Sequence, residues 1–207
     1  IMTKVAVVVL DTLRKDTFDR FFDWLPGTRF EAAYSTANWT CPAHTSLFTG
    51  KYADEAGVTA KSYHLPTEVE TLPNVLSTAG YDTIGYSANQ NVSERTGFDR
   101  GFETFHGHVS LLNPNRDVLN VSAFLAEDDS DGLSKHVRTM WECVRSSNDT
   151  LPSLRFAFAC QFPNLFSKKT VSDHGAKSVL KLLRKQSWNS DNVFAFINLM
   201  EAHTPYY

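Results

Sequence analysis

Apolar residues repeat along this chain in two patterns that alternate with each other. Residues 5–10 (VAVVVL) and 192–199 (NVFAFINL) are nearly continuous apolar runs, which are typical of strands buried on both faces of a parallel sheet. Residues 71–79 and 174–186 instead carry apolar side chains at helical spacing. Strands that alternate with helices predict an α/β fold whose sheet is doubly wound, mostly parallel and flanked by helices.

Other segments extend the same alternation. Residues 29–35 (RFEAAYS) and 82–89 (DTIGYSAN) have the composition of short strands, and a helix is expected over 18–25, before a Pro-Gly pair. Another helix is expected from residue 40 to residue 49, with a proline in its first turn and a glycine after its last residue. The periodicity weakens over 109–170, which predicts an insertion or cap over the sheet.

Polar residues stand at the end of each predicted strand. Asp11 follows the first strand, Thr40 follows the second, Asn89 ends the third, and Glu201 and His203 follow the last. In doubly wound sheets, ligands bind beyond the carboxyl ends of the strands. We therefore expect these side chains to converge on one site suited to a metal ion or an oxyanion.

Thr40 has two possible roles at the start of its predicted helix. Its hydroxyl can cap the helix, or it can attack a phosphate or sulfate held by the free N–H groups at the helix N-terminus. As a nucleophile it needs activation, most simply by a metal ion bound to Asp11. His44, one turn later, is either a polar surface residue or a contact to the oxyanion or leaving group.

Bulk composition excludes several classes of partner. The net charge is −3 and the 20 Lys and Arg residues are scattered, which argues against nucleic acid. No apolar run approaches the roughly 18 residues of a membrane helix. Cys41, Cys143 and Cys160 lack metal-ligand spacing, and favour free thiols in a reducing compartment. With no signal peptide before the first strand, a cytoplasmic location is expected.

Four segments carry a resemblance to a known family. They are residues 7–16 (VVVLDTLRKD), 34–52 (YSTANWTCPAHTSLFTGKY), 97–107 (GFDRGFETFHG) and 194–207 (FAFINLMEAHTPYY). In this order they resemble sulfatases of the alkaline-phosphatase superfamily, over nearly the whole chain except 109–170. The resemblance implies an alkaline-phosphatase-like α/β fold and a metal-dependent hydrolase of small-molecule phosphate or sulfate esters.

The resemblance also identifies a nucleophile. Sulfatases carry a Cys or Ser two residues before a proline and an Arg two residues after it, and the Cys or Ser is oxidised to formylglycine. Here Pro42 sets the register, so that Thr40 takes the nucleophile position, Cys41 the free position and His44 the position of the Arg. Threonine cannot become formylglycine. The Thr-x-Pro-x-His pattern resembles relatives that hydrolyse phosphodiesters with an unmodified threonine, which implies a preference for phosphoesters.

The same resemblance assigns the remaining site residues. Asp11 and Thr40 correspond to a site for a divalent metal ion (zinc, manganese or calcium). His203 corresponds to a residue that contacts the oxyanion or a metal ion, and Asn89 stands near a substrate-contacting position. Thr12 stands where many sulfatases have a second metal-binding aspartate, so one ligand of that site is missing.

A later part of the family pattern is displaced. Sulfatases complete the metal site with an Asp-His-Gly motif after the segment equivalent to 194–207. The SDHG sequence at 172–175 comes before that segment, and we expect it to start a helix, with Asp173 as a possible cap. The chain 1–207 is therefore expected to be the N-terminal part of a single domain, with an incomplete metal site and little activity of its own.

Three alternatives remain open from the sequence. A true sulfatase would use Thr40 unmodified, or Cys41 in a shifted register. A transferase would pass the phosphoryl group from Thr40 to an alcohol instead of to water. A non-catalytic scaffold or binding domain would have kept the fold and lost the metal site.

Overall fold

The computed structural model describes residues 3–107, residues 175–203 except 189, and a few positions between 137 and 154. The chain divides into two compact units, one formed by residues 1–108 with 173–207 and the other by residues 109–172. The described elements below belong to the first unit. The predictions for 109–170, of an insertion or cap, lie almost entirely outside the described residues and stay predictions.

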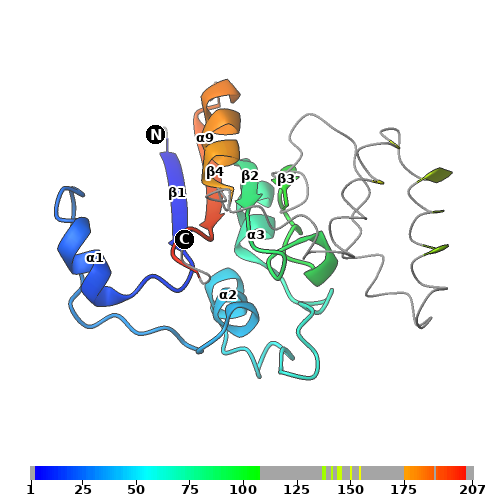
Figure 1. Cartoon of the computed structure of the whole chain (residues 1–207), viewed down its shortest axis with the longest axis horizontal. Coiled ribbons are helices and arrows are strands. Elements are labelled where there is room, and N and C mark those ends of the chain that lie inside the picture. Colours follow the sequence, from blue (N-terminus) through cyan, green and yellow to red (C-terminus); the bar gives the residue numbers. More distant parts are fainter. Residues whose placement is uncertain are drawn as a thin grey trace. The chain divides into compact units, whose positions relative to one another are not determined.

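The first unit is built on a four-stranded parallel sheet (Figure 1). Its strands are β1 (Thr3–Leu10), β2 (Asp82–Ser87), β3 (Thr104–His106) and β4 (Asn192–Leu199), in the order β1-β4-β2-β3. The last strand of the chain therefore lies between β1 and β2. This arrangement confirms the predicted α/β class with a parallel sheet, and three of the strands match the apolar runs that predicted them.

Strand β1 corrects one prediction. It was expected to be buried on both faces, yet the Val5 and Val8 side chains are 41% and 56% exposed. β1 is the edge strand of the described sheet, whereas β4 has a neighbour on both sides and buries residues 193–198. The apolar run therefore predicted the strand correctly but not its burial.

A second correction concerns residues 29–35, which form no strand. Their side chains face solvent, and those of Phe30 and Tyr34 are 75% and 90% exposed. This segment does not pair with the sheet, in which β1 has β4 as its one described neighbour. It is an irregular connection that leads into the helix at Thr40.

Four described α-helices accompany the sheet: α1 (Lys15–Phe21), α2 (Thr40–Thr49), α3 (Leu72–Thr78) and α9 (Ala176–Lys185). A 3-10 turn, η1, spans Glu94–Thr96. The bounds of α2, α3 and α9 lie within two residues of the predicted ones, whereas α1 begins three residues before the predicted start at residue 18 and ends four residues before the predicted end at residue 25. Among the described residues no helix is long and apolar enough to cross a membrane.

Helix α9 begins at Ala176, and Gly175 is its N-cap residue. Gly175 has φ +119°, and a Cβ added there would lie 2.9 Å from the Cβ of Ala88, so only glycine fits. The sequence predicted a cap at Asp173, which lies outside the described residues. The helix start is therefore determined by a glycine that approaches the end of β2.

Aromatic side chains hold α2 against the sheet. The Phe48 ring makes edge contacts with Phe196 of β4 at 4.9 Å and with Phe98 at 5.5 Å between ring centroids. All three side chains are buried in the main hydrophobic cluster of the unit. Because Phe48 lies two turns after Thr40, this packing determines where the first residue of α2 lies relative to β4.

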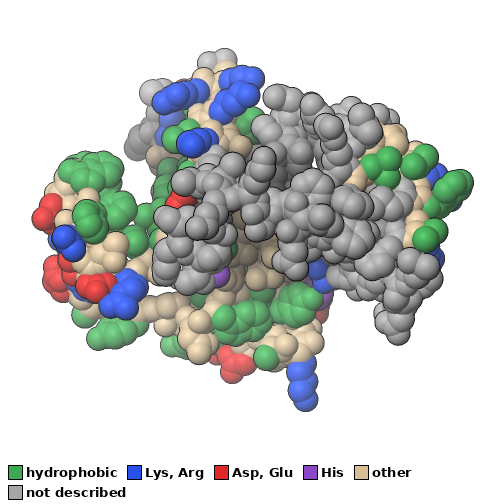
Figure 2. Space-filling model, viewed as in Figure 1, with side chains coloured by type: hydrophobic (Ala, Val, Ile, Leu, Met, Phe, Trp, Pro, Cys, Tyr) green, Lys and Arg blue, Asp and Glu red, His purple; other side chains and the backbone are tan. Residues whose placement is uncertain are grey.

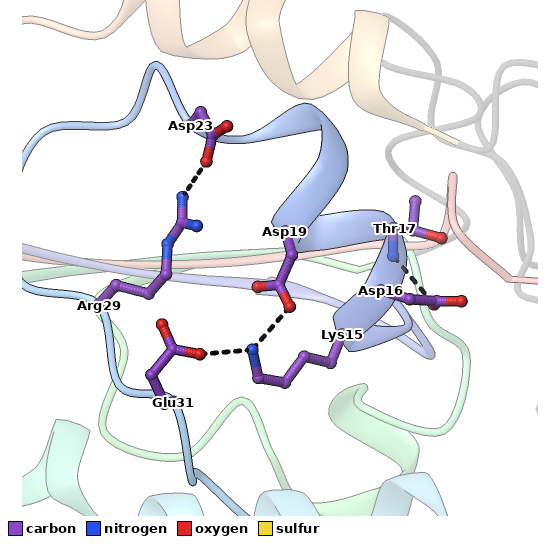
Figure 3. Close-up of polar contacts among 7 residues, drawn as sticks. All are labelled: Lys15, Asp16, Thr17, Asp19, Asp23, Arg29 and Glu31. Atoms are coloured by element: carbon purple, nitrogen blue, oxygen red, sulfur yellow. Dashed lines mark hydrogen bonds and ion pairs between the residues drawn. The ribbon is translucent and has the colours of Figure 1, made fainter.

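Helix α1 is attached in a different way. It buries no residue, and its side chains meet the following loop through ion pairs (Figure 3). Lys15 Nζ lies 2.7 Å from Asp19 Oδ2 and 3.0 Å from Glu31 Oε2, and Arg29 pairs with Asp23 at 2.9 Å. Hydrophobic side chains remain visible on the surface of this helix and its loop (Figure 2).

Candidate active site

Three of the predicted site residues meet at the carboxyl ends of the strands, where α2 begins (Figure 1). Asn89 Nδ2 donates a hydrogen bond of 2.7 Å to Asp11 Oδ2, and Thr40 Oγ1 lies 3.4 Å from the same oxygen. Asn89 Nδ2 is also 3.5 Å from Thr40 Oγ1. Asp11 and Asn89 come from the ends of β1 and β2, on either side of β4, and Thr40 comes from the start of α2.

Thr40 does not cap its helix. The N-cap residue of α2 is Trp39, and no side chain makes a capping hydrogen bond there. The Thr40 hydroxyl is directed instead to the Asp11 carboxylate. Of the two roles that the sequence left open, the structure therefore excludes the simple cap and leaves the hydroxyl at the mouth of the site.

The Asn89 amide is held in one orientation. Its Oδ1 accepts a hydrogen bond of 2.8 Å from the backbone N–H of Asn91, so its Nδ2 must be the group that faces Asp11. The Ser87 hydroxyl donates to the Asn89 carbonyl at 3.1 Å and holds the backbone at the end of β2. Asn89, only 3% exposed, thus serves as a hydrogen-bond donor to the buried Asp11 carboxylate.

A cavity of about 190 Å³ opens beside this group. Its lining consists of Thr40, Ala88, Asn89, Gln90, Asn91, Met200 and His203. The structure therefore brings His203 to the same cavity as Thr40 and Asn89, while Asp11 lies behind them. Among these residues hydroxyl, amide and imidazole groups supply the polar surface.

His44 lies in a different place from the one predicted. Its side chain is buried, with Nδ1 2.9 Å from the Thr40 carbonyl oxygen and Nε2 2.8 Å from Asn198 Nδ2. Burial lowers the pKa of His44 below its usual value. Both ring nitrogens are engaged within the core, and His44 does not line the cavity that Thr40 and His203 share. Its contact to an oxyanion stays a prediction.

Cys41 is fully buried beside Thr40. Its Sγ lies 3.6 Å from the carbonyl oxygen of Asn91, and burial raises the pKa of the thiol to about 11. It does not line the cavity. The neighbour that looks more reactive in the sequence therefore lies inside the hydrophobic cluster, whereas the threonine faces the cavity.

Thr12 and Glu201 make hydrogen bonds that hold neighbouring segments beside the site, a role that the sequence did not predict for them. Thr12 adopts φ +58°, unusual for a threonine, and its hydroxyl donates to the Ala202 carbonyl at 3.1 Å. Glu201 Oε1 accepts the N–H of Ala176, at 2.7 Å, and so serves the N-terminus of α9. Glu201 was predicted only as a polar strand-end residue, and here it links that loop to the helix.

Sequence reasoning missed Asn198. It lies within the apolar run of β4, is completely buried, and contacts His44 across 154 positions of sequence. The available signal was a single amide inside an otherwise apolar strand, since buried polar side chains need a partner. The partner itself could not be identified without the fold.

The predicted metal site has few donor atoms. Asp11 and Thr40 supply one carboxylate and one hydroxyl, and the Asn89 oxygen is already bonded to Asn91. Across residues 3–107 and 175–203, no three His, Cys, Asp or Glu side chains form a group that could hold a metal ion. Catalytic zinc takes about three protein ligands and calcium about six to eight oxygens, so these residues alone do not fit a metal ion.

A family model identifies the family of this chain. Residues 13–207 match the family model described as Sulfatase. An N-acetylglucosamine-6-O-sulfatase from Bacteroides thetaiotaomicron is 32% identical over 73 residues, which cover 35% of this chain and 13% of that protein. The crystal structure of a phosphonate monoester hydrolase from Agrobacterium radiobacter aligns with a TM-score of 0.40 and 14% identity, over 83% of this chain and 33% of its own length.

Both relatives are much longer than the region they share with this chain. Members of the matched family typically bind a divalent metal ion and act on esters. The family model spans all but the first 12 residues, and includes Thr40, His44, Asn89 and His203. The chain belongs to the sulfatase family.

Proposed function

We propose that the chain carries the nucleophile of a hydrolase of small-molecule phosphate or sulfate esters, that Thr40 is this nucleophile, and that phosphoesters are preferred. The observation that carries the proposal is the Thr40 hydroxyl itself. It makes no capping bond, lies 3.4 Å from Asp11 Oδ2, and lines a cavity together with Asn89 and His203. Family membership supports the reaction class.

The first step follows from this geometry. Thr40 Oγ forms a bond to phosphorus while the bond from phosphorus to the leaving alcohol breaks, and the hydroxyl proton passes to Asp11 Oδ2, its hydrogen-bond partner. The leaving alkoxide takes up a proton from solvent. Water then attacks the phosphorus of the phosphoryl-Thr40 intermediate and loses a proton to solvent, the bond from phosphorus to Thr40 Oγ breaks to release the phosphate monoester, and Asp11 returns its proton to Thr40. His203, on the wall of the same cavity, would contact the non-bridging oxygens of the ester.

The burial of Cys41 supports the preference for phosphorus. A formylglycine nucleophile at Cys41 would have to reach the cavity from a side chain that is fully buried. Thr40 is the residue of this pair that lines the cavity, and an unmodified threonine suits a phosphoryl intermediate. A shifted register with Cys41 as the nucleophile would require the start of α2 to rotate.

The test compares hydrolysis of bis(p-nitrophenyl) phosphate and p-nitrophenyl sulfate by the purified chain, with zinc, manganese or calcium added in turn. T40A should abolish phosphodiester turnover, whereas T36A, in the exposed loop before α2, should not change it. Mass spectrometry of the 35–52 peptide after acid quench should find a p-nitrophenyl phosphoryl group on Thr40, since only one of the two p-nitrophenolates leaves in the first step. Formylglycine at Cys41 would contradict the proposal and favour a true sulfatase, and product transfer to added alcohol would identify a transferase.

One observation favours a second candidate, a binding or scaffold domain without turnover. Asp11 and Thr40 bring together one carboxylate and one hydroxyl, and no three His, Cys, Asp or Glu side chains among the described residues form a group that could hold a metal ion. Calorimetry with zinc, manganese and calcium separates the two candidates. Absence of metal binding together with absence of turnover would favour the scaffold, whereas turnover that T40A abolishes would exclude it.

A further inference from the structure

Asn198 is the most unusual side chain of the central strand. It lies between apolar neighbours in β4 and is 0% exposed. Its Oδ1 is buried without a hydrogen-bond partner among the described residues. An unsatisfied buried oxygen costs about 1–3 kcal/mol, and a leucine of similar size would avoid this cost. Stability alone therefore does not account for an asparagine at this position.

Two hydrogen bonds select the tautomer of His44, and the Asn198 side chain makes one of them. His44 Nδ1 lies 2.9 Å from the Thr40 carbonyl oxygen, which can only accept, so Nδ1 carries a proton. His44 Nε2 lies 2.8 Å from Asn198 Nδ2, which can only donate, so Nε2 carries none. The two contacts agree on a single neutral form of the ring.

The ring is also held on its sides. The His44 ring makes edge contacts with Phe98 at 6.3 Å and with Phe196 at 6.1 Å between centroids. Both phenylalanines belong to the hydrophobic cluster, so the imidazole can neither tilt nor leave easily. Its Nδ1–H therefore presents a fixed donor to the carbonyl of Thr40, the first residue of α2.

We propose that Asn198 is a positioning residue for Thr40, acting through His44. By donating to Nε2, Asn198 keeps the proton on Nδ1, and Nδ1–H holds the first turn of α2 so that the Thr40 hydroxyl stays at Asp11. The chain of contacts runs from the centre of the sheet to the mouth of the site. The inference rests on the proposed function only in taking Thr40 as the nucleophile.

The first test measures the tautomer directly. Chain labelled with ¹⁵N-histidine should show, for His44, a protonated Nδ1 and an unprotonated Nε2. N198L should replace this pattern with a mixture of tautomers, because Nε2 loses its donor. The matched control is N192L, at the other end of β4, where Asn192 bonds to the N–H of Thr3; it should leave His44 unchanged. A proton on Nε2 in the unmodified chain would overturn the inference, even if N198L fails to fold.

The second test separates positioning from a structural role. N198L should lower kcat for the phosphodiester about 10- to 100-fold with KM nearly unchanged, while its thermal stability is equal to or above that of the parent chain. A fall in stability with unchanged kcat of the folded fraction would make Asn198 structural and refute the inference. If the unmodified chain hydrolyses no ester, the proposed function fails, and the tautomer measurement still decides whether Asn198 controls His44.

Discussion

Helix α1 and the strand-end region, which comprises Asp11, Thr40, His44, Asn89 and Asn198, are each stabilised by a different kind of interaction. α1 and its loop rely on ion pairs between largely exposed side chains and bury no residue of the helix. The strand-end region relies on hydrogen bonds between buried groups, among them Asn89 with Asp11 and Asn198 with His44. The candidate site is therefore built as part of the core.

This difference has an energetic consequence. Exposed ion pairs contribute little, because solvent and salt screen them and long side chains lose entropy when they pair. A buried polar group that loses its partner carries the full cost of its desolvation. Substitutions around Thr40 should consequently disturb stability or chemistry, whereas equivalent substitutions around α1 should be tolerated.

The largest effect is expected from F48A. Phe48 is buried and contacts Phe98, Phe102 and Phe196. Removing its ring leaves a cavity between α2 and β4, and should lower the free energy of unfolding by about 3–5 kcal/mol. Urea denaturation followed by circular dichroism would measure it.

The control for F48A is F21A in α1. The Phe21 side chain is 58% exposed, with the Arg20 guanidinium 5.0 Å from its ring centre. Its loss should shift stability by no more than about 0.5 kcal/mol. Equal losses for the two variants would contradict the distinction between the two regions.

Cys41 provides a chemical test of burial at the site. Its pKa of about 11, compared with 9.0 for an ordinary thiol, leaves about 100-fold less thiolate near pH 8. Iodoacetamide should therefore label Cys41 at least about 100-fold more slowly in the native chain than in urea, and raising the pH to 9 should increase the native rate without removing the difference. Mass spectrometry of the 35–52 peptide follows this cysteine alone. Rapid native labelling would place the thiol outside the core.

Part of the convergence of Asp11, Thr40 and Asn89 could be predicted from sheet geometry. Parallel strands end at one edge of a sheet, so Asp11 after β1 and Asn89 after β2 were expected at the same edge, and they meet there although β4 lies between their strands. Thr40 was predicted to follow a strand over 29–35, but it reaches the other two from an irregular connection at the start of α2. The apolar runs of β2 and β4 located those ends to within two residues. Helix ends were similarly marked, by Gly50 after α2 and Gly80 after α3.

Burial and pairing could not be predicted in the same way. The valines of β1 resemble those of a central strand, and only the strand order shows that β1 lies at an edge. The roles of His44 and Asn198 depend on which way a helix and a strand face each other across 154 positions. A pattern along the chain does not contain that information.

A smaller effect is expected from T71A. Thr71 caps α3 by accepting the N–H of Asn74, within a reciprocal capping box, and its hydroxyl also donates to Asn74 Oδ1. Its loss should cost about 1–2 kcal/mol. The corresponding position in α1 is Arg14, which makes no side-chain capping bond, so R14A should cost less. Chemical denaturation of both variants measures the difference, and an equal or greater loss for R14A would show that the caps of α1 and α3 do not differ as described.

The smallest effect is expected from K15Q, which removes the cation between Asp19 and Glu31. These carboxylates raise the pKa of Lys15 through hydrogen bonds. The lysine is therefore charged at neutral pH, and both ion pairs are present there. The Lys15 side chain is nevertheless about half exposed, and water screens both contacts. Unfolding midpoints of K15Q and the parent chain should therefore coincide within error at both low and high salt. A marked loss of stability at low salt that disappears at high salt would show that α1 depends on its ion pairs more strongly than their exposure implies.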